Sequence, residues 1–209
     1  MSAATILTLA NGRGIDLRNP EVGDIDFAAC AEHLAKEKRY NGATPGVEYS
    51  VAEHLVRGTD AIIDQTGDRL LAAYFSLHDV HEAVLKDDTT PKKRAIAEEC
   101  EAQFGVLAEH VLAAFRTLEF RHDLAIHGAA DLPWPMPPAL APLVKHWDLV
   151  MFVTEWRDLM GGVPHPNWGP YSKIAPVAGK IVPWGWQVAC TALQARWRAL
   201  LPALYQAAA

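Results

Sequence analysis

Apolar residues recur every three or four positions along much of the chain, a spacing that predicts helices with one buried face. The first predicted helix begins after Asp26, a residue type that commonly caps helices, and reaches the basic cluster at 36–39. The second begins after Ser50, which forms a capping-box pattern with Glu53, and ends near Asp64. The first half of the chain is therefore expected to be mainly helical.

The stretch at 70–77 is a nearly unbroken apolar run that ends abruptly in polar residues, among them His78, Asp79 and Glu82. An ionised carboxylate in a dry interior costs several kcal/mol unless it is paired, so an Asp that closes a core helix predicts a partner such as a divalent cation. In helical geometry Glu82 shares a face with His78 and Asp79. One ion could meet His78 and Asp79 while Glu82 stays close by without binding it directly. The alternative is a histidine hydrogen-bonded at a helix end beside solvated acids.

The second half of the chain alternates between helical patterns and proline-rich segments. A helix is predicted over 90–118, followed by a loop over 120–142 that contains five prolines. A second His-Asp pair, at 122–123, falls in that loop and is interpreted as having no role in a site, because a loop supplies no fixed ligand geometry. The segment 143–160 is apolar nearly all round and predicts an interior helix, and 184–205 predicts a last helix that acts as a lid or brace.

The N-terminal segment is expected to form a small hairpin, because an Asn-Gly dipeptide at 11–12 separates the apolar stretches 5–9 and 15–17. The segment 39–49 carries two glycines, a proline and an asparagine, and is predicted to be a loop. Its Arg39 is therefore free to point at a ligand.

Composition places these elements in one domain over residues 1–209, with a core at about 22–160 and a proline- and tryptophan-rich extension at 161–209. A net charge of -6 argues against binding to a nucleic acid polymer. Three distant cysteines indicate free thiols in a reducing compartment. The chain has no basic leader and no apolar run long enough for a membrane span, so a cytoplasmic protein is expected.

Asp148 is an anomaly in the interior helix predicted at 143–160, because Trp147 and other large apolar residues surround it. One interpretation is a ligand to a buried cation. The other is an Asp paired with Lys145 or Arg157, and the residue alone does not decide between them.

His54 lies between Val51 and Leu55 in helical angle and is expected to face inward. Three predicted helices thus carry ligand-type side chains in apolar settings, a pattern typical of a metal site between helices of a bundle. These side chains are His54, His78, Asp79 and Asp148. The pattern predicts one divalent ion per chain, and the mixed His and Asp set does not choose among Mn, Co, Fe, Ni, Zn and Mg.

The order H…HD…D resembles that of the HD-domain phosphohydrolase superfamily, and in particular the branch with bacterial 5'-deoxynucleotidases and phage dATP triphosphohydrolases. The matching pieces are RYNG at 39–42, YSVAEH at 49–54, HDVHEA at 78–83, the TP pair at 90–91 and the segment 144–160. The resemblance implies an all-α fold, an HD-domain helical bundle, here with a small N-terminal β-hairpin. One departure is Ala43, where members of this branch often have a histidine.

The resemblance also implies roles for individual residues. The four ligand-type side chains would hold the ion, Glu82 would be the catalytic acid or base, Asp87 would support the attacking water or the sugar, and Arg39 would meet phosphate. The implied reaction is cleavage of the 5' phosphoester of a nucleotide, which releases a nucleoside and either phosphate or triphosphate. A small-molecule nucleotide is then the expected partner, in the cytoplasm of a bacterium or a phage-infected host.

Two other functions are compatible with the same residues. A non-catalytic nucleotide sensor would keep the metal pocket and act by binding alone. A helical interaction module would hold no ion. Helical bundles with apolar outer helices often pair, so a homo-oligomer is expected.

Overall fold

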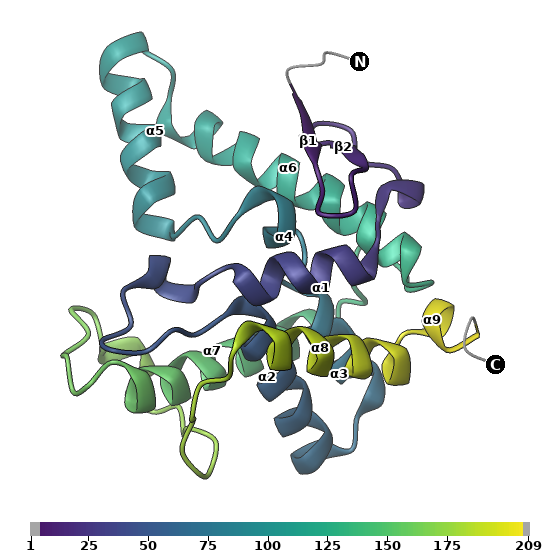
Figure 1. The fold of residues 1–209 in the computed structure, drawn as a ribbon. Coiled ribbons are helices and arrows are strands. Elements are labelled where there is room, and N and C mark those ends of the chain that lie inside the picture. Colours follow the sequence, from purple (N-terminus) through teal and green to yellow (C-terminus); the bar gives the residue numbers. More distant parts are fainter. Residues whose placement is uncertain (1–4, 207–209) are drawn as a thin grey trace.

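The computed structural model describes residues 5–206, which form a bundle of helices with one small antiparallel sheet (Figure 1). The strands are β1 (Ile6–Thr8) and β2 (Gly14–Asp16). The helices of the first half are α1 (Phe27–Lys36), α2 (Val51–Thr66), α3 (Arg69–Leu77) and α4 (Glu82–Leu85). Those of the second half are α5 (Thr90–Phe104), α6 (Ala108–Ala129), α7 (Ala141–Leu159), α8 (Trp186–Leu200) and α9 (Pro202–Gln206). Short 3-10 helices occupy Val22–Asp24, Arg39–Gly42 and Gly169–Tyr171. None of the described helices has the length and hydrophobicity that a membrane crossing requires.

The predicted hairpin is confirmed, with Ile6 opposite Asp16 in the register of β1 and β2. Gly12 takes a φ of +79°, which the turn requires and which costs a glycine little. Leu9 and Ile15 are buried and join the hydrophobic core, so the hairpin is anchored to the helices.

The core lies where α1, α2, α3 and α8 pack together. The caps expected at its first two helices are present: the Asp26 carboxylate accepts from Ala28 N and Ala29 N, and the Ser50 hydroxyl accepts from Glu53 N. Trp197 of α8 is fully buried and donates from Nε1 to the carbonyl of Ser76 at 3.1 Å. The last long helix is therefore a brace across the bundle rather than a lid.

The prediction of one helix over 90–118 and a loop from 120 is wrong. Helix α5 ends at Phe104, because Gly105 adopts the left-handed conformation (φ 66°) that terminates helices, and α6 continues to Ala129. All five prolines of the segment 120–142 lie after Asp131, so they leave the first ten residues free to be helical.

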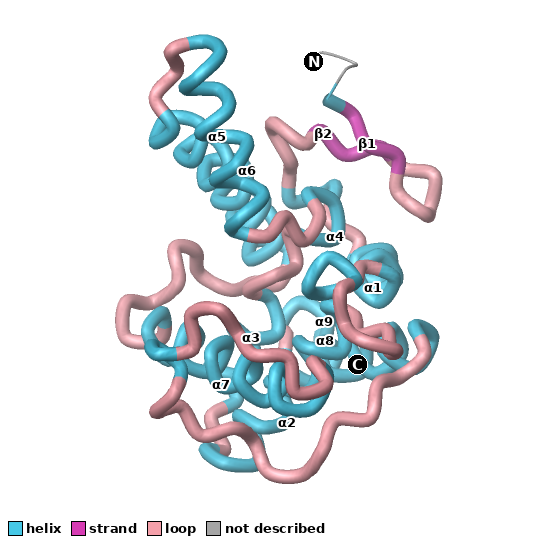
Figure 2. Tube along the Cα trace, turned by 90° about the vertical axis from the view of Figure 1, so that its left-hand side faces the viewer, coloured by secondary structure: helices cyan, strands magenta, loops and turns pink. Residues whose placement is uncertain are grey.

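Helices α5 and α6 form a hairpin that projects from the rest of the molecule (Figure 2). Several apolar side chains of this hairpin are exposed rather than packed as a structural stripe, and Phe104 is 71% exposed. The others are Ile96, Val106 and Leu107. A homo-oligomer stays a prediction, and these side chains are where it would be sought.

The second His-Asp pair lies in α6, not in a loop, and has defined partners away from the first pair's cluster. His122 is fully buried, with Nε2 3.0 Å from the carbonyl of Leu17. Asp123 Oδ1 lies 2.9 Å from Nδ1 of His81. The pair therefore ties α6 to the N-terminal hairpin and to the turn that precedes α4.

Burial lowers the pKa of both His122 and His127, so both are neutral in the folded chain near neutral pH. At pH values between these lowered pKa values and the usual histidine pKa of about 6.5, the two histidines bind protons in the unfolded chain but not in the folded chain. The free energy of unfolding should therefore fall as the pH drops below about 6.5. We expect His122→Gln to reduce this dependence by up to about 1.4 kcal/mol per pH unit, measured by urea denaturation at a series of pH values. Identical pH dependence in variant and wild type would contradict the assignment.

Candidate metal centre

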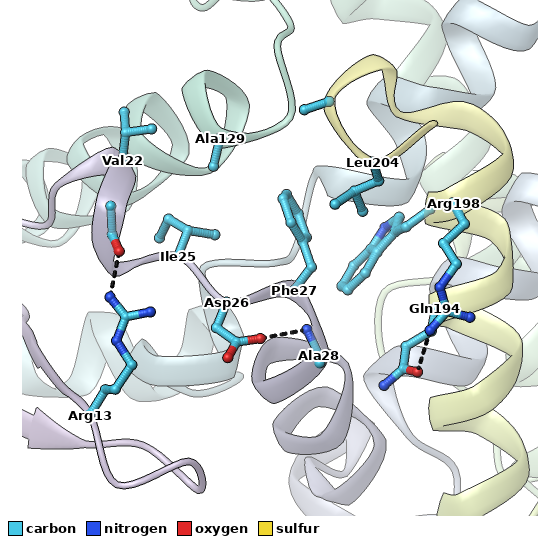
Figure 3. A pocket seen from close by; sticks show the side chains of 13 residues that line it. Arg13, Val22, Ile25, Asp26, Phe27, Ala28, Ala129, Gln194, Arg198 and Leu204 are labelled. Carbon is cyan, nitrogen blue, oxygen red and sulfur yellow. Dashed lines mark hydrogen bonds between the residues drawn. The ribbon is translucent and has the colours of Figure 1, made fainter. Parts of the chain in front are cut away.

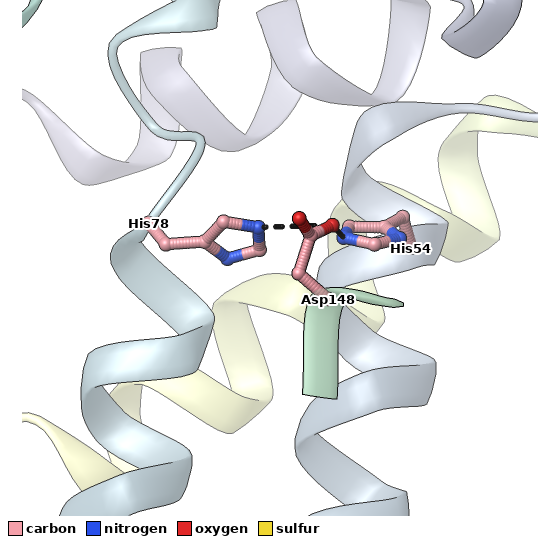
Figure 4. A group of neighbouring side chains, drawn as sticks. All are labelled: His54, His78 and Asp148. Carbon is pink, nitrogen blue, oxygen red and sulfur yellow. Dashed lines mark ion pairs between the residues drawn. The ribbon is translucent and has the colours of Figure 1, made fainter. Parts of the chain in front are cut away.

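Three side chains from different parts of the chain meet at one point of the bundle (Figure 4). His54 comes from α2, His78 follows the last residue of α3, and Asp148 comes from α7. Asp148 Oδ1 lies 3.8 Å from His54 Nε2 and 3.9 Å from His78 Nε2. One ligand atom from each side chain lies within 4.8 Å of those of the other two, which is close enough for a single ion to be shared.

Asp79 lies at the same point. Its Oδ2 atom is 3.2 Å from His78 Nε2 and 3.8 Å from His54 Nε2. Ligands bonded at about 2.1 Å to a first-row divalent ion are roughly 3 to 3.5 Å apart. The separations between each carboxylate and the two imidazoles are equal to that or a few tenths of an ångström wider. The group whose ligand atoms all lie within 4.8 Å of one another contains His54, His78 and Asp148, so Asp79 would have to move to join them at one ion. The structure thus gathers the predicted ligand set, whose role as ligands stays a prediction.

The turn after α3 explains how two consecutive residues face the same point. Helix α3 ends at Leu77, and from His78 N onward the backbone forms hydrogen bonds to the third preceding carbonyl, as in a 3-10 helix. The expected uninterrupted helix through Glu82 is therefore replaced by a tighter turn and the short helix α4.

Both imidazoles are oriented by hydrogen bonds at Nδ1. His54 Nδ1 lies 2.6 Å from Glu155 Oε1, and His78 Nδ1 lies 2.7 Å from the carbonyl of Phe75. Because these oxygens can only accept, each Nδ1 carries the proton and each Nε2 presents a lone pair in the neutral ring. Both Nε2 atoms are buried and have no hydrogen-bond partner among the described residues. In the neutral rings these two nitrogens, beside two carboxylates, supply the ligand set that a divalent cation needs. The residues therefore fit such an ion, which would replace the proton that the carboxylates favour on His78.

Glu155 is a site residue that sequence reasoning missed. It is fully buried on α7 and accepts hydrogen bonds from Arg39 Nε at 3.1 Å and from the Tyr40 hydroxyl at 2.6 Å, besides that from His54. Burial alone would raise the pKa of Glu155, but Arg39 and His54 hold it below its usual value. A carboxylate that holds a metal-binding histidine in place is a common arrangement in metal sites. The available signal was its position two helical turns after Asp148 in an apolar helix.

Arg39 connects the two carboxylate-bearing elements. Its Nε atom donates to Glu155, and its Nη1 atom donates to Asp79 Oδ2 at 3.3 Å. Tyr40 and Asn41 have φ values of 58° and 53°, which is an uncommon conformation for these residue types and is maintained here by the contacts of the loop. The predicted loop thus contains a fixed turn that presents Arg39 to the cluster.

The electrostatics of the cluster favour a cation at its centre. Burial would raise the pKa of Asp79 and of Asp148, but His78, His54 and Arg39 hold both values well below the usual range, so both are ionised. Burial would lower the pKa of His78, but the two carboxylates raise it well above its usual value. The centre attracts positive charge, and a metal ion would compete with that proton for His78.

Each of the two interpretations of Asp148 applies to a different carboxylate oxygen. Lys145 Nζ lies 2.7 Å from Oδ2, as the paired interpretation expects, while Oδ1 faces the two imidazoles. Arg157, the other candidate partner, instead pairs with Asp158. The ion pair therefore does not occupy the atom that a metal would use.

The two residues assigned to catalysis are electrostatically coupled to the cluster. Burial, followed by the charges of Asp79 and Asp87, raises the pKa of Glu82 well above its usual value, and Glu82 Oε2 is buried without a partner in the described chain. Burial also raises the pKa of Asp87, with Arg39 acting in the opposite sense. The protonated form of Glu82 is therefore favoured in the ion-free protein.

A glycine allows the close packing beneath the cluster. The ring of Phe75 lies 4.6 Å from that of His78 and 5.6 Å from that of His54, measured between centroids. A Cβ atom at Gly58 of α2 would lie 2.2 Å from the Phe75 ring, far inside contact distance. A larger residue at Gly58 would thus displace the ring that supports both imidazoles.

A separate pocket of about 630 Å³ lies between the N-terminal segment, the start of α1 and the end of α8 (Figure 3). Arg13, Phe27, Gln194 and Leu204 are among the residues that line it. None of its lining residues belongs to the cluster, so this pocket plays no part in the metal centre.

Comparison with known proteins identified one relevant relative and no family model that matches the chain. An uncharacterised protein of Rhodobacter capsulatus is 31% identical over 157 residues, which cover 73% of this chain and 72% of that protein. Its name states no activity, so the relationship adds no function to the geometry of the site.

Proposed function

The chain belongs to the family of this Rhodobacter capsulatus protein, and we propose that it is a metal-dependent phosphohydrolase of the HD-domain type. The reaction we propose is cleavage of the 5' phosphoester of a deoxynucleotide. One observation carries the proposal: two buried imidazole Nε2 atoms, each fixed by a bond at Nδ1, are left unpaired beside two ionised carboxylates. Such a centre suits metal-assisted hydrolysis.

The ion would be held by His54, His78, Asp79 and Asp148. Bound there, a divalent ion polarises a phosphoryl oxygen and lowers the pKa of water towards neutrality. The nitrogen and oxygen donors suit several first-row divalent ions as well as magnesium. Manganese and cobalt are therefore the first ions to supply in an assay.

Arg39 would bind the phosphate. Its Nε and Nη1 atoms donate to Glu155 and Asp79, which fix the side chain. Burial would lower the pKa of Arg39, but Glu155, Tyr40 and Asp79 raise it well above its usual value, so the guanidinium stays charged. Its remaining N–H groups would meet a phosphate oxygen.

Glu82 would be the proton donor. Burial and the neighbouring carboxylates favour the protonated form of Glu82 in the ion-free protein, and the unpaired Oε2 atom is where a proton could be given to the leaving 5'-oxygen of the sugar. Once ionised, the same carboxylate could accept a proton from the attacking water. Asp87, coupled to Glu82 through its charge, would support this exchange.

The test is hydrolysis of a panel of deoxynucleoside monophosphates and triphosphates with manganese or cobalt. We expect release of the nucleoside, and analysis of the products from dAMP and dATP will distinguish a monophosphatase from a triphosphohydrolase. Inactivity on the whole panel, with the ion bound, would contradict the proposal. Tight nucleotide binding without turnover would instead support the alternative function, a non-catalytic nucleotide sensor.

Glu82→Gln should separate catalysis from metal binding. The amide cannot exchange a proton in this way, so we expect the turnover number to fall roughly 10²- to 10⁴-fold, the usual range for loss of a general acid or base. The metal content should stay at the wild-type level, because Glu82 is not one of the four ligand side chains. Glu98→Gln, an exposed change on α5, is the matched control. Equal turnover in the two variants would exclude Glu82 from the chemistry.

A further inference from the structure

A pocket of about 460 Å³ opens directly beside the metal centre. Its polar wall contains His78, Asp79, Lys145 and Asp148. The remaining walls come from α6, from the proline-rich connection between α6 and α7, and from the start of α7. Arg39, the proposed phosphate-binding group, is not among its lining residues.

Aromatic and aliphatic side chains form most of the pocket wall, with Phe120, Trp134, Met136 and Val144 among them. The Phe120 and Trp134 ring centroids are 6.4 Å apart, and Phe120 is 46% exposed. Trp134 is held from behind by a stacked contact with His127, whose ring centroid lies 4.2 Å away. The pocket therefore offers ring faces held by the structure, which suit a planar ligand.

We propose that this pocket binds the base of the nucleotide, packed against the rings of Phe120 and Trp134. The assignment of the ligand rests on the proposed function, since the 5' phosphate would sit at the neighbouring metal centre. The cationic side chain in the wall, Lys145, is paired with Asp148 Oδ2, and the rest of the wall is His78, carboxylates and apolar side chains. Such a pocket suits the uncharged base of a nucleotide better than its phosphate.

The first test measures binding of deoxyadenosine, which lacks the phosphate, by NMR titration of the ion-free protein. Two variants are compared with wild type: Phe120→Ala removes one of the two rings, and Trp134→Leu replaces the other ring with an aliphatic side chain. Leu124→Ala, an exposed change on the same helix outside the pocket, is the control. We expect both pocket variants to weaken binding, by about 5- to 150-fold for Phe120→Ala, and the control to bind as wild type does.

The second test is kinetic. For the Phe120 variant we expect KM for dAMP to rise more than the turnover number falls, and a much smaller loss on deoxyribose 5-phosphate, which has no base. A change in fold would instead impair hydrolysis of both substrates to the same extent.

The outcomes distinguish this inference from the proposed function. If wild type hydrolyses nucleotides but the variants bind deoxyadenosine as tightly as wild type, the pocket assignment is wrong and the activity stands. If wild type binds deoxyadenosine through Phe120 and Trp134 but hydrolyses no nucleotide, the pocket assignment stands and the activity is wrong. Failure of wild type to bind deoxyadenosine at all overturns the inference.

Discussion

Asp148→Ala is expected to abolish stoichiometric binding of the divalent ion and, with it, hydrolysis. Oδ1 is the only carboxylate oxygen from α7 that faces both imidazoles, at 3.8 and 3.9 Å. Its loss should weaken metal binding by more than the roughly 10- to 100-fold that follows removal of an outer hydrogen-bond partner. The measurement is the metal content of the purified protein after dialysis, together with its activity on the nucleotide panel.

Lys145→Ala is the matched control, because it removes the ion pair of Asp148 and leaves Oδ1 in place. Lys145 is 67% exposed, and such a pair contributes no more than about 1 kcal/mol to stability. We expect this variant to keep its metal. If Asp148 served only as the partner of Lys145, the two variants would have the same metal content, and that result would contradict the proposed centre.

Glu155→Gln should have the largest effect on stability. The carboxylate is fully buried and accepts hydrogen bonds from His54, Arg39 and Tyr40. The glutamine amide would remove the negative charge that pairs with Arg39. Its NH₂ group would also face side chains that can only donate here. Breaking a buried ion pair on one side typically costs about 3 to 5 kcal/mol. We expect a loss of that order in the free energy of unfolding, and a fall in metal affinity of roughly 10- to 100-fold because His54 loses its fixed orientation.

The comparison variant is Asp60→Asn, which neutralises the partner of Arg196 at a half-exposed ion pair. Such a pair is worth about 0 to 1 kcal/mol, so little change is expected. Chemical denaturation measures both variants, and titration with manganese measures their affinity. If both variants lost equally little unfolding free energy and manganese affinity, Glu155 would not hold the metal centre in place.

Local signals predicted the parts of the fold that depend on neighbouring residues. The Asn-Gly turn, the caps at Asp26 and Ser50 and the apolar pattern of α2 and α7 each act within a few residues, and the structure contains all of these elements. The division into α5 and α6 was missed because Gly105 lies within a stripe that remains periodic across it. The helical residues after Leu118 were missed because nearby prolines dominate that window.

The candidate site divides in the same way. His54, His78, Asp79 and Asp148 stood out as polar residues in apolar settings, and the fold brings them together. Glu155 did not stand out, because α7 is apolar nearly all round and its pattern does not say which side meets α2. Residues that act through contacts between distant segments become visible only when those segments are packed.

A crystal of the protein grown with manganese, measured near the metal's absorption edge, tests the central claim most directly. We expect one strong anomalous peak per chain, from an ion bonded to His54 Nε2, His78 Nε2 and one oxygen each of Asp79 and Asp148. A manganese-loaded protein with no anomalous peak among these four side chains, or with its only ordered ion elsewhere, would contradict the proposed metal centre.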